Sequence, residues 1–217
     1  MTPRSGFTAA QVRAAEQPLL DAGEPLMRRA AAALAAELRG FAPQRVLVLV
    51  GAGDNGGDAL FAAAELAADG VHVDLVATAS RHHEEGARAA EDAGARWAEA
   101  TDAPALAASA DVVVDGILGT GSSGALRGTA REVVAAIAPL LERPERPRVV
   151  AVDIPSGVSP DDGSVPDPAV LPADLTVTFG AEKAGLLLDP GARYAGRVVL
   201  VDLGLGPHLG DPVVTAE

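Results

Sequence analysis

Cysteine is absent from this chain of 217 residues, and its absence removes several classes of site at once. Without thiols the chain can form no disulfide, thiolate zinc site or iron–sulfur cluster, and it has no cysteine nucleophile. Aromatic residues make up only 3% of the sequence. We therefore expect a core built mostly of Ala, Val and Leu, and no aromatic platform for stacking the bases of single-stranded nucleic acid.

Long hydrophobic runs and an excess of positive charge are also missing. No apolar run approaches the roughly 20 residues that cross a bilayer, and the opening MTPRSGFTAAQVRAAEQ lacks the apolar centre of a secretory signal. Lys and Arg number 17 against 30 Asp and Glu, which gives a formal net charge of −13. Such a charge repels phosphate backbones and anionic lipids. We expect a cytoplasmic protein with neither nucleic acid nor membrane as a partner.

Hydrophobic residues make up 48% of the sequence, and short apolar segments alternate with helical stretches along the chain. Short continuous apolar runs predict strands buried on both faces, at residues 45–51, 71–77, 111–118, 148–154, 173–179 and 197–203. Helices are predicted at residues 10–39 (kinked or split in two by Pro18 and Pro25), 58–68, 84–93 and 131–141. This alternation predicts one α/β domain with a mostly parallel sheet. The last two strands lack a helix between them, so we expect that edge to be irregular or antiparallel.

Three turns after predicted strands carry the candidate functional residues, and the first is GAGDNGGD at 51–58. Its glycines permit a close backbone approach to a ligand. It is not a Walker loop, because Lys-Ser/Thr is missing, and Asp54, Asn55 and Asp58 make it a poor dinucleotide fingerprint. Its carboxylates favour hydroxyl groups or a cation as the ligand. A plain tight turn, with Asp58 near the helix start, is the alternative.

The second and third turns each place an aspartate at the end of an apolar strand. Asp115 closes one strand and precedes a loop rich in Gly, Ser and Thr, which either wraps a phosphate or is merely flexible. Asp153 closes another strand, before Pro155 and Ser156, and either serves a site or caps a turn. Carboxylates from three turns at one sheet edge suggest a cation site or an acid/base site, and the spacing does not choose between them.

Lys183 is a further candidate because lysine is scarce in this chain, although a lone lysine is more often a solvated surface charge. The histidines have no spacing typical of a metal site; they are His72, His82, His83 and His208.

In this order, the turns resemble those of the YjeF N-terminal domain family, the NAD(P)H-hydrate epimerases. The matching segments span about residues 45–205 and are VGAGDNGGDAL, DVVVDGILGTG, VVAVDIPSGV, ADLTVTFGAEKAGLL and YAGRVVLVDLGL. The resemblance implies a three-layer α/β/α sandwich of Rossmann-like type, with one domain over residues 1–217. It leaves open that the tail at 206–217 begins a linker to a dehydratase domain.

The resemblance also implies an isomerase of nicotinamide nucleotide repair, which interconverts the R and S epimers of hydrated NADH and NADPH (NADHX and NADPHX). An ATP- or ADP-dependent dehydratase, sometimes fused to the epimerase, is the implied functional partner, and a homodimer is the implied assembly. Asn55, Asp115 and Ser156 are implied ligands of K⁺, which as a hard cation prefers oxygen. The implied substrate-binding residues are Asp54, Asn55, Gly56, Gly57, Asp58, Gly119, Thr120, Gly121, Ser122, Ser123, Gly124, Ala125 and Asp153.

We hypothesise that Asp153 is the catalytic acid/base on the hydroxyl group of the hydrated ring, with Lys183 orienting or stabilising its carboxylate. The lone pair of the ring nitrogen would assist the departure of water, and the planar iminium would take up water on either face. Two other functions compete with this one. A non-catalytic binding or dimerisation module is disfavoured because Asn55, Asp115, Asp153 and Ser156 are all present together. A generic nucleotide-dependent oxidoreductase is disfavoured by the poor dinucleotide fingerprint.

Overall fold

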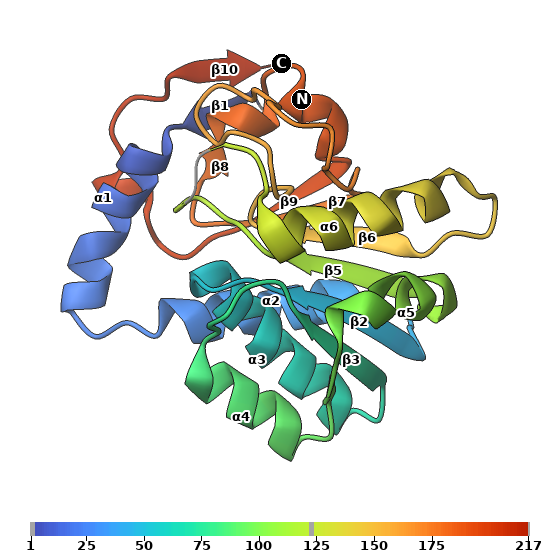
Figure 1. Cartoon of the computed structure of the whole chain (residues 1–217). Coiled ribbons are helices and arrows are strands. Elements are labelled where there is room, and N and C mark those ends of the chain that lie inside the picture. The colour runs from blue at the N-terminus through green and yellow to red at the C-terminus, as the bar shows by residue number, and fades with distance from the viewer. Residues whose placement is uncertain (1–2, 122–123, 217) are drawn as a thin grey trace.

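A parallel sheet of seven strands, in the order β4-β3-β2-β5-β6-β7-β9, forms the centre of the molecule (Figure 1). The computed structural model describes residues 3–121 and 124–216. All neighbouring strands of this sheet run parallel. The strands are β2 (Arg45–Val50), β3 (His72–Ala77), β4 (Arg96–Ala98), β5 (Val112–Gly116), β6 (Arg148–Val152), β7 (Leu175–Phe179) and β9 (Arg197–Val201).

Helices cover both faces of this sheet and complete three layers. One face packs against α2 (Leu26–Arg39), α3 (Asp54–Ala68) and α4 (Glu84–Asp92). The other face packs against α5 (Ala103–Ser109) and α6 (Gly128–Ile137). Alternate residues of β2, β5 and β6 enter opposite cores, as the two-residue period of a strand requires. The predicted α/β class and the mostly parallel sheet are confirmed.

Helix α1 (Ala9–Asp21) lies outside the sandwich, beside a second, smaller sheet (Figure 1). The helix begins at a capping box formed by Thr8 and Gln11. The small sheet has the order β10-β1-β8 and consists of β1 (Arg4–Phe7), β8 (Glu182–Lys183) and β10 (Val214–Ala216). Because β10 pairs with β1, part of the tail at 206–217 belongs to the domain, and its role as the start of a linker stays a prediction.

Several predicted boundaries differ from the structure. The helical stretch at 10–39 forms two helices, with Pro18 inside α1 and Pro25 at the N-cap of α2. The antiparallel alternative for the last strand was wrong, because β9 runs parallel to β7. The connection between them is irregular, as expected, and consists of β8 and two 3₁₀ turns at Ala184–Leu186 and Gly191–Tyr194. Strand β4 and helix α5 are too short to give a clear periodic signal.

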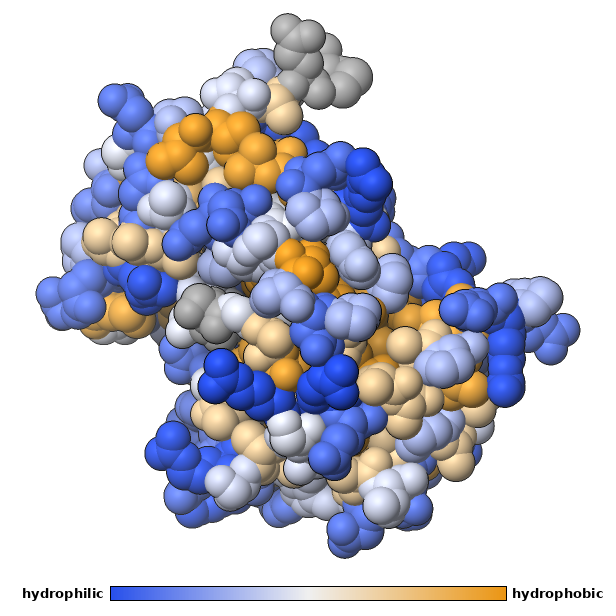
Figure 2. Space-filling view, turned by 45° about the horizontal axis from the view of Figure 1, so that its top comes forward, coloured by the Kyte–Doolittle hydropathy of each residue, from blue (hydrophilic) through white to orange (hydrophobic). Residues whose placement is uncertain are grey.

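The strand order reverses between β2 and β5. From β2 the chain moves outward to β3 and β4, and it then returns to the other side of β2 and continues outward through β5, β6, β7 and β9. In open α/β sheets, ligands bind beyond the carboxyl ends of the strands at such a reversal. The visible surface is largely hydrophilic, with hydrophobic residues gathered in a few places (Figure 2). No helix in the described residues is long and apolar enough to cross a membrane.

Candidate active site

A cavity of about 550 Å³ lies at the carboxyl ends of the central strands. Its walls come from α1, α2, the first turn of α3 and the loops after β5 and β6. Four of the five charged side chains that line it are carboxylates; the five are Arg13, Glu16, Asp54, Asp58 and Asp153. A site with this lining handles protons or a cation more readily than it binds phosphate.

The structure brings most of the predicted substrate-binding residues to this cavity. Those that line it are Asp54, Asn55, Asp58, Gly119, Thr120, Gly121 and Asp153. Gly56 and Gly57 lie buried in the first turn of α3 and do not line it, whereas Ala125 lines an adjoining cavity. Gly124 lines neither cavity, and Ser122 and Ser123 lie outside the described residues.

The turn GAGDNGGD forms the start of α3 rather than a loop before it. The helix begins at Asp54, four residues earlier than predicted. This early start brings the helix very close to the end of β2, because a Cβ on Gly56 would lie 2.2 Å from the carbonyl oxygen of Gly51. Glycine at position 56 therefore allows Asn55 and Asp58 to sit directly at the strand ends.

Asp153 and Lys183 form a buried ion pair at the bottom of the site. Lys183, the only lysine of the chain, is 1% exposed, so the surface-charge alternative was wrong. Its ammonium group donates to Asp153 Oδ1, to Thr178 Oγ1 at 3.1 Å and to the carbonyl oxygen of Phe179 at 2.9 Å. The other carboxylate oxygen of Asp153 accepts from the backbone N–H of Thr120 at 3.1 Å and from its hydroxyl group.

The backbone of Asp153 has a φ of +68°, a conformation that costs energy for a residue with a side chain. Such strain concentrates at functional sites, and here it accompanies a carboxylate that faces both the cavity and Lys183. Burial alone would raise the pKa of Asp153. The charge of Lys183 and the hydrogen bonds from Lys183 and Thr120 outweigh burial and hold this pKa below its usual value. Asp153 is therefore ionised at neutral pH and can accept a proton.

The surroundings of Asp58 shift its pKa in the opposite direction from that of Asp153. Asp58 is 8% exposed, it lines the cavity, and its Oδ1 has no hydrogen-bond partner among the described residues. Burial, followed by the nearby negative charges of Asp153 and Asp54, raises the pKa of Asp58 well above its usual value. Its carboxyl group therefore favours the neutral form, which can donate a hydrogen bond or a proton.

The sequence interpretation missed Glu16 and Arg13, which reach the site from α1. Burial raises the pKa of Glu16, and Arg13 donates to the carbonyl oxygen of Thr120 at 2.8 Å. One signal was available: Glu16 continues the spacing of the buried Val12 and Ala15, so a carboxylate lies on the apolar stripe of the helix.

Asp115, Asn55 and Ser156 meet beneath the cavity. Asp115 is 0% exposed, and its two oxygens accept from the hydroxyl group of Ser156 at 2.6 Å and from its backbone N–H at 2.9 Å. The amide nitrogen of Asn55 donates to the carbonyl oxygens of Leu118 at 3.1 Å and Val152 at 2.8 Å. The hydroxyl group of Ser156 lies 3.2 Å from the same oxygen of Leu118.

These donors suit a hard cation better than a transition metal. Burial raises the pKa of Asp115, and the hydrogen bonds from Ser156 and Ile117 only oppose this shift. No cationic side chain pairs with Asp115 in the part of the chain that is described. A buried carboxylate with a neighbouring hydroxyl and amide oxygen is a fitting set for an alkali cation. Within the same residues there is no group of three or more His, Cys, Asp or Glu that could hold a metal.

Known proteins resemble this chain over almost its full length. An NAD(P)H-hydrate epimerase of Clavibacter michiganensis subsp. michiganensis is 56% identical over 219 residues, which cover 97% of this chain and 95% of the relative. One from Microbacterium testaceum is 54% identical, covering 98% and 84%. The bifunctional NAD(P)H-hydrate repair enzyme Nnr of Mycobacterium tuberculosis is 42% identical, and the match covers 93% of this chain but only 42% of that protein.

The fold has a solved counterpart. The crystal structure of the yeast protein YNL200c matches with a TM-score of 0.76 and 16% identity, covering 96% of this chain and 95% of the yeast chain. The profile of the family described as YjeF-related protein N-terminus matches residues 23–185, which is well over half of the sequence and includes Asn55, Asp58, Asp115, Asp153 and Lys183. The chain therefore belongs to the YjeF-related N-terminal domain family, as its turns had indicated.

Proposed function

We propose that this protein is an NAD(P)H-hydrate epimerase, an isomerase that interconverts the R and S epimers of NADHX and NADPHX. Three relatives that are 54–57% identical carry this name, which supports the proposal. The observation that carries it is the ion pair of Asp153 and Lys183 beside a cavity that is lined by both Asp153 and the buried Asp58, whose pKa is raised. Epimerisation at a hydroxyl-bearing carbon needs one group that gives a proton and one that takes it.

In the first step, a neutral carboxyl group protonates the hydroxyl of the hydrated ring. The carbon–oxygen bond breaks, water leaves, and the lone pair of the ring nitrogen forms the carbon–nitrogen double bond of a planar iminium. Asp58 fits this role because burial, together with the nearby charges of Asp153 and Asp54, raises the pKa of its carboxyl group and so favours the protonated form. Lys183 and Thr120 hold Asp153 as the carboxylate during this step.

In the second step, water attacks the planar carbon from the opposite face and gives its proton to Asp153. The double bond returns its electrons to the ring nitrogen, so the hydroxyl group is now on the other face, its oxygen comes from the second water, and the composition of the molecule is unchanged. The reverse reaction exchanges the two roles, because Asp153 is then the acid and Asp58 the base. This scheme assigns Asp58 a role in proton transfer in addition to the role in binding that the resemblance implied.

We propose that Asn55, Asp115 and Ser156 hold K⁺, which neutralises the buried charge of Asp115. The ion would also fix the segments that carry these residues, at the ends of β5 and β6 and the start of α3. Asn55 adds to the fit through its side-chain oxygen. A Cβ on Gly119 would lie 2.6 Å from Asn55 Oδ1, so only glycine at position 119 leaves room for this oxygen.

A dehydratase that consumes the S epimer is the functional partner that we propose, and the fused relatives support this pairing. The cytoplasmic location and the homodimer remain predictions. Nothing in the described lining of the cavity favours a non-catalytic module, because Asp153 and Asp58 line one cavity with pKa values shifted in opposite directions, which serves proton transfer.

Epimer exchange tests the proposed function. Purified S-NADHX is incubated with the protein, and the R form is followed by chromatography against the spontaneous rate. We expect the unchanged protein to exchange the epimers faster than this blank. The Asp153→Asn/Lys183→Met variant, which lacks both charges, should not exceed the blank. A rate equal to the blank with folded protein in potassium buffer contradicts the proposal.

A further inference from the structure

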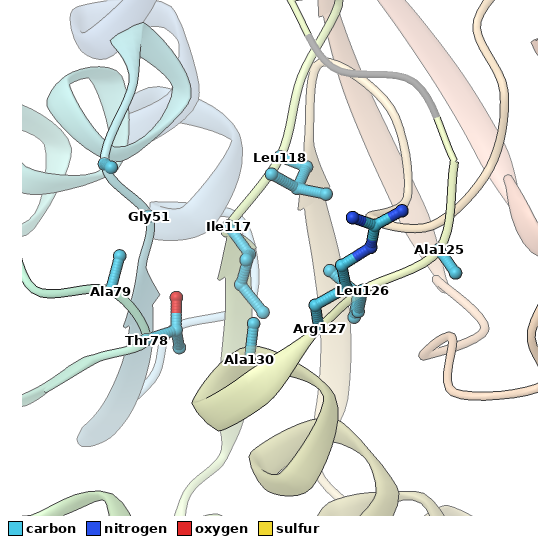
Figure 3. Close-up of a pocket in the computed structure, with 10 residues that line it drawn as sticks. Gly51, Thr78, Ala79, Ile117, Leu118, Ala125, Leu126, Arg127 and Ala130 are labelled. Atoms are coloured by element: carbon cyan, nitrogen blue, oxygen red, sulfur yellow. The ribbon is translucent and has the colours of Figure 1, made fainter.

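A second cavity of about 360 Å³ adjoins the first and is lined mostly by apolar side chains (Figure 3). The two cavities share Ala52, Ile117 and Leu118 as lining residues. Thr78 and Ala79, after β3, line one side, and the segment Ala125–Arg127 before α6 lines the other (Figure 3). The second cavity therefore lies over the reversal between β2 and β5, next to the proposed reaction site.

The two cavities differ sharply in charge. The first is lined by four carboxylates and by Arg13, whose guanidinium donates to the carbonyl oxygen of Thr120. The second has Arg127 as its one charged lining residue among the described residues. The guanidinium of Arg127 makes no hydrogen bond or ion pair within the described chain, although the chain has 30 acidic residues. An arginine left without a carboxylate partner in so acidic a protein is available for an anionic ligand.

We propose that Arg127 binds the diphosphate of the substrate and directs its adenosine half into this second cavity. This inference rests on the proposed function for the identity of the dinucleotide. A guanidinium binds phosphate through short, charge-assisted hydrogen bonds. The apolar walls formed by Ala79, Leu126 and Ala130 suit the faces of a purine.

The position of Arg127 distinguishes the diphosphate from the 2′-phosphate of NADPHX. Figure 3 shows its guanidinium on the side of the cavity where Leu118 lies, and Leu118 also lines the first cavity. With the hydrated ring at Asp153, the group that crosses between the two cavities is the linker of the dinucleotide, which is its diphosphate. The carboxylates of the first cavity repel this group, so the charge pattern fixes the direction in which the substrate lies.

The test combines kinetics with a binding assay that does not require turnover. Arg127→Ala is expected to raise KM for NADHX about 10- to 100-fold, as the loss of charged hydrogen bonds does, while kcat stays near that of the unchanged protein. Arg127→Lys keeps the positive charge but loses the paired N–H donors of the guanidinium. Its KM for NADHX should therefore lie between that of the unchanged protein and that of Arg127→Ala. Arg131→Ala is the matched control, because Arg131 lies one turn further along α6, pairs with Asp167 and lines neither cavity.

Calorimetry with ADP-ribose, which lacks the nicotinamide ring, provides the second readout. Arg127→Ala should weaken its binding by a similar factor, and Arg131→Ala should not. Equal affinity in both variants overturns the inference, and so does a loss that is confined to NADPHX. Failure of the proposed function would differ, because the unchanged protein would then not accelerate epimer exchange even though Arg127 still governed the binding of ADP-ribose.

Discussion

At the scale of single residues, the site depends on two carboxyl groups whose pKa values the fold shifts in opposite directions. Asp153 is ionised because Lys183 and Thr120 compensate for its burial. Burial and the charges of Asp153 and Asp54 raise the pKa of Asp58, the charge of Lys183 only partly opposes this shift, and Asp58 Oδ1 has no hydrogen-bond partner among the described residues. Pairs of titratable groups with divergent pKa values are how enzymes assign acid and base roles at one pH.

Removing one member of the buried pair should cost more stability than removing both. Asp153→Asn leaves the ammonium of Lys183 buried without its counter-charge, a change that typically costs about 3–5 kcal/mol. Asp153→Asn/Lys183→Met eliminates both charges and is expected to recover most of this loss, and neither variant should catalyse epimerisation. Urea unfolding measures the free energies, and a double variant as unstable as the sum of the single variants would contradict the pairing.

The raised pKa of Asp58 predicts a difference in stability between Asp58→Asn and the unchanged protein, and this difference should grow with pH. Because its folded-state pKa lies above the value of about 3.9 in the unfolded chain, the folded protein loses stability as pH rises from that value through the folded-state pKa. Asp58→Asn has no such ionisation, so its melting temperature relative to the unchanged protein should be higher at pH 8 than at pH 4. Asp92→Asn, at an exposed position of α4, is the control. A difference that does not vary with pH would contradict the account.

Sequence reasoning found residues that follow strands and missed residues that reach the site from elsewhere. Asp115 and Asp153 end apolar runs, where burying a carboxylate costs free energy unless a partner compensates for it. Glu16 carried a weaker signal, and Arg127 carried none, because its role depends on a cavity formed by segments that are distant in sequence.

At the scale of elements, the strand ends and the start of α3 decide where the chemistry lies. The apolar runs predicted the six longer strands of the central sheet, because a strand buried on both faces consists almost entirely of apolar residues. They could not predict the parallel pairing of β9, since strand direction depends on how an irregular connection packs. Nor could they place the start of α3, which rests on the close approach of Gly56 to Gly51.

Potassium should stabilise the fold through these strand ends. At a concentration ten times its dissociation constant, a bound ion adds about 1.4 kcal/mol, which for a domain of this size raises the melting temperature by a few degrees. Thermal unfolding in potassium chloride and in choline chloride at equal ionic strength measures the effect. Asp115→Asn should abolish the difference. A shift of equal size in this variant would show that Asp115 does not hold the ion.

At the scale of the whole molecule, the active site joins two parts of the fold that are far apart in sequence. Helix α1 covers the cavity from outside the sandwich, and it packs through Val12 and Ala15 against Ala181 and Leu205. Strand β10 pairs with β1 next to it. No periodic pattern in the sequence indicated these contacts, because the strands of the small sheet have only two to four residues.

The most direct test of the central claim is epimer exchange in water enriched in oxygen-18, with chromatographic separation and mass detection of the two epimers. R-NADHX should form from S-NADHX faster than in the blank, and the newly formed R epimer should carry one solvent oxygen, because water leaves from one face and enters from the other. Exchange no faster than the blank, or an R epimer that retains the original oxygen, would contradict this claim.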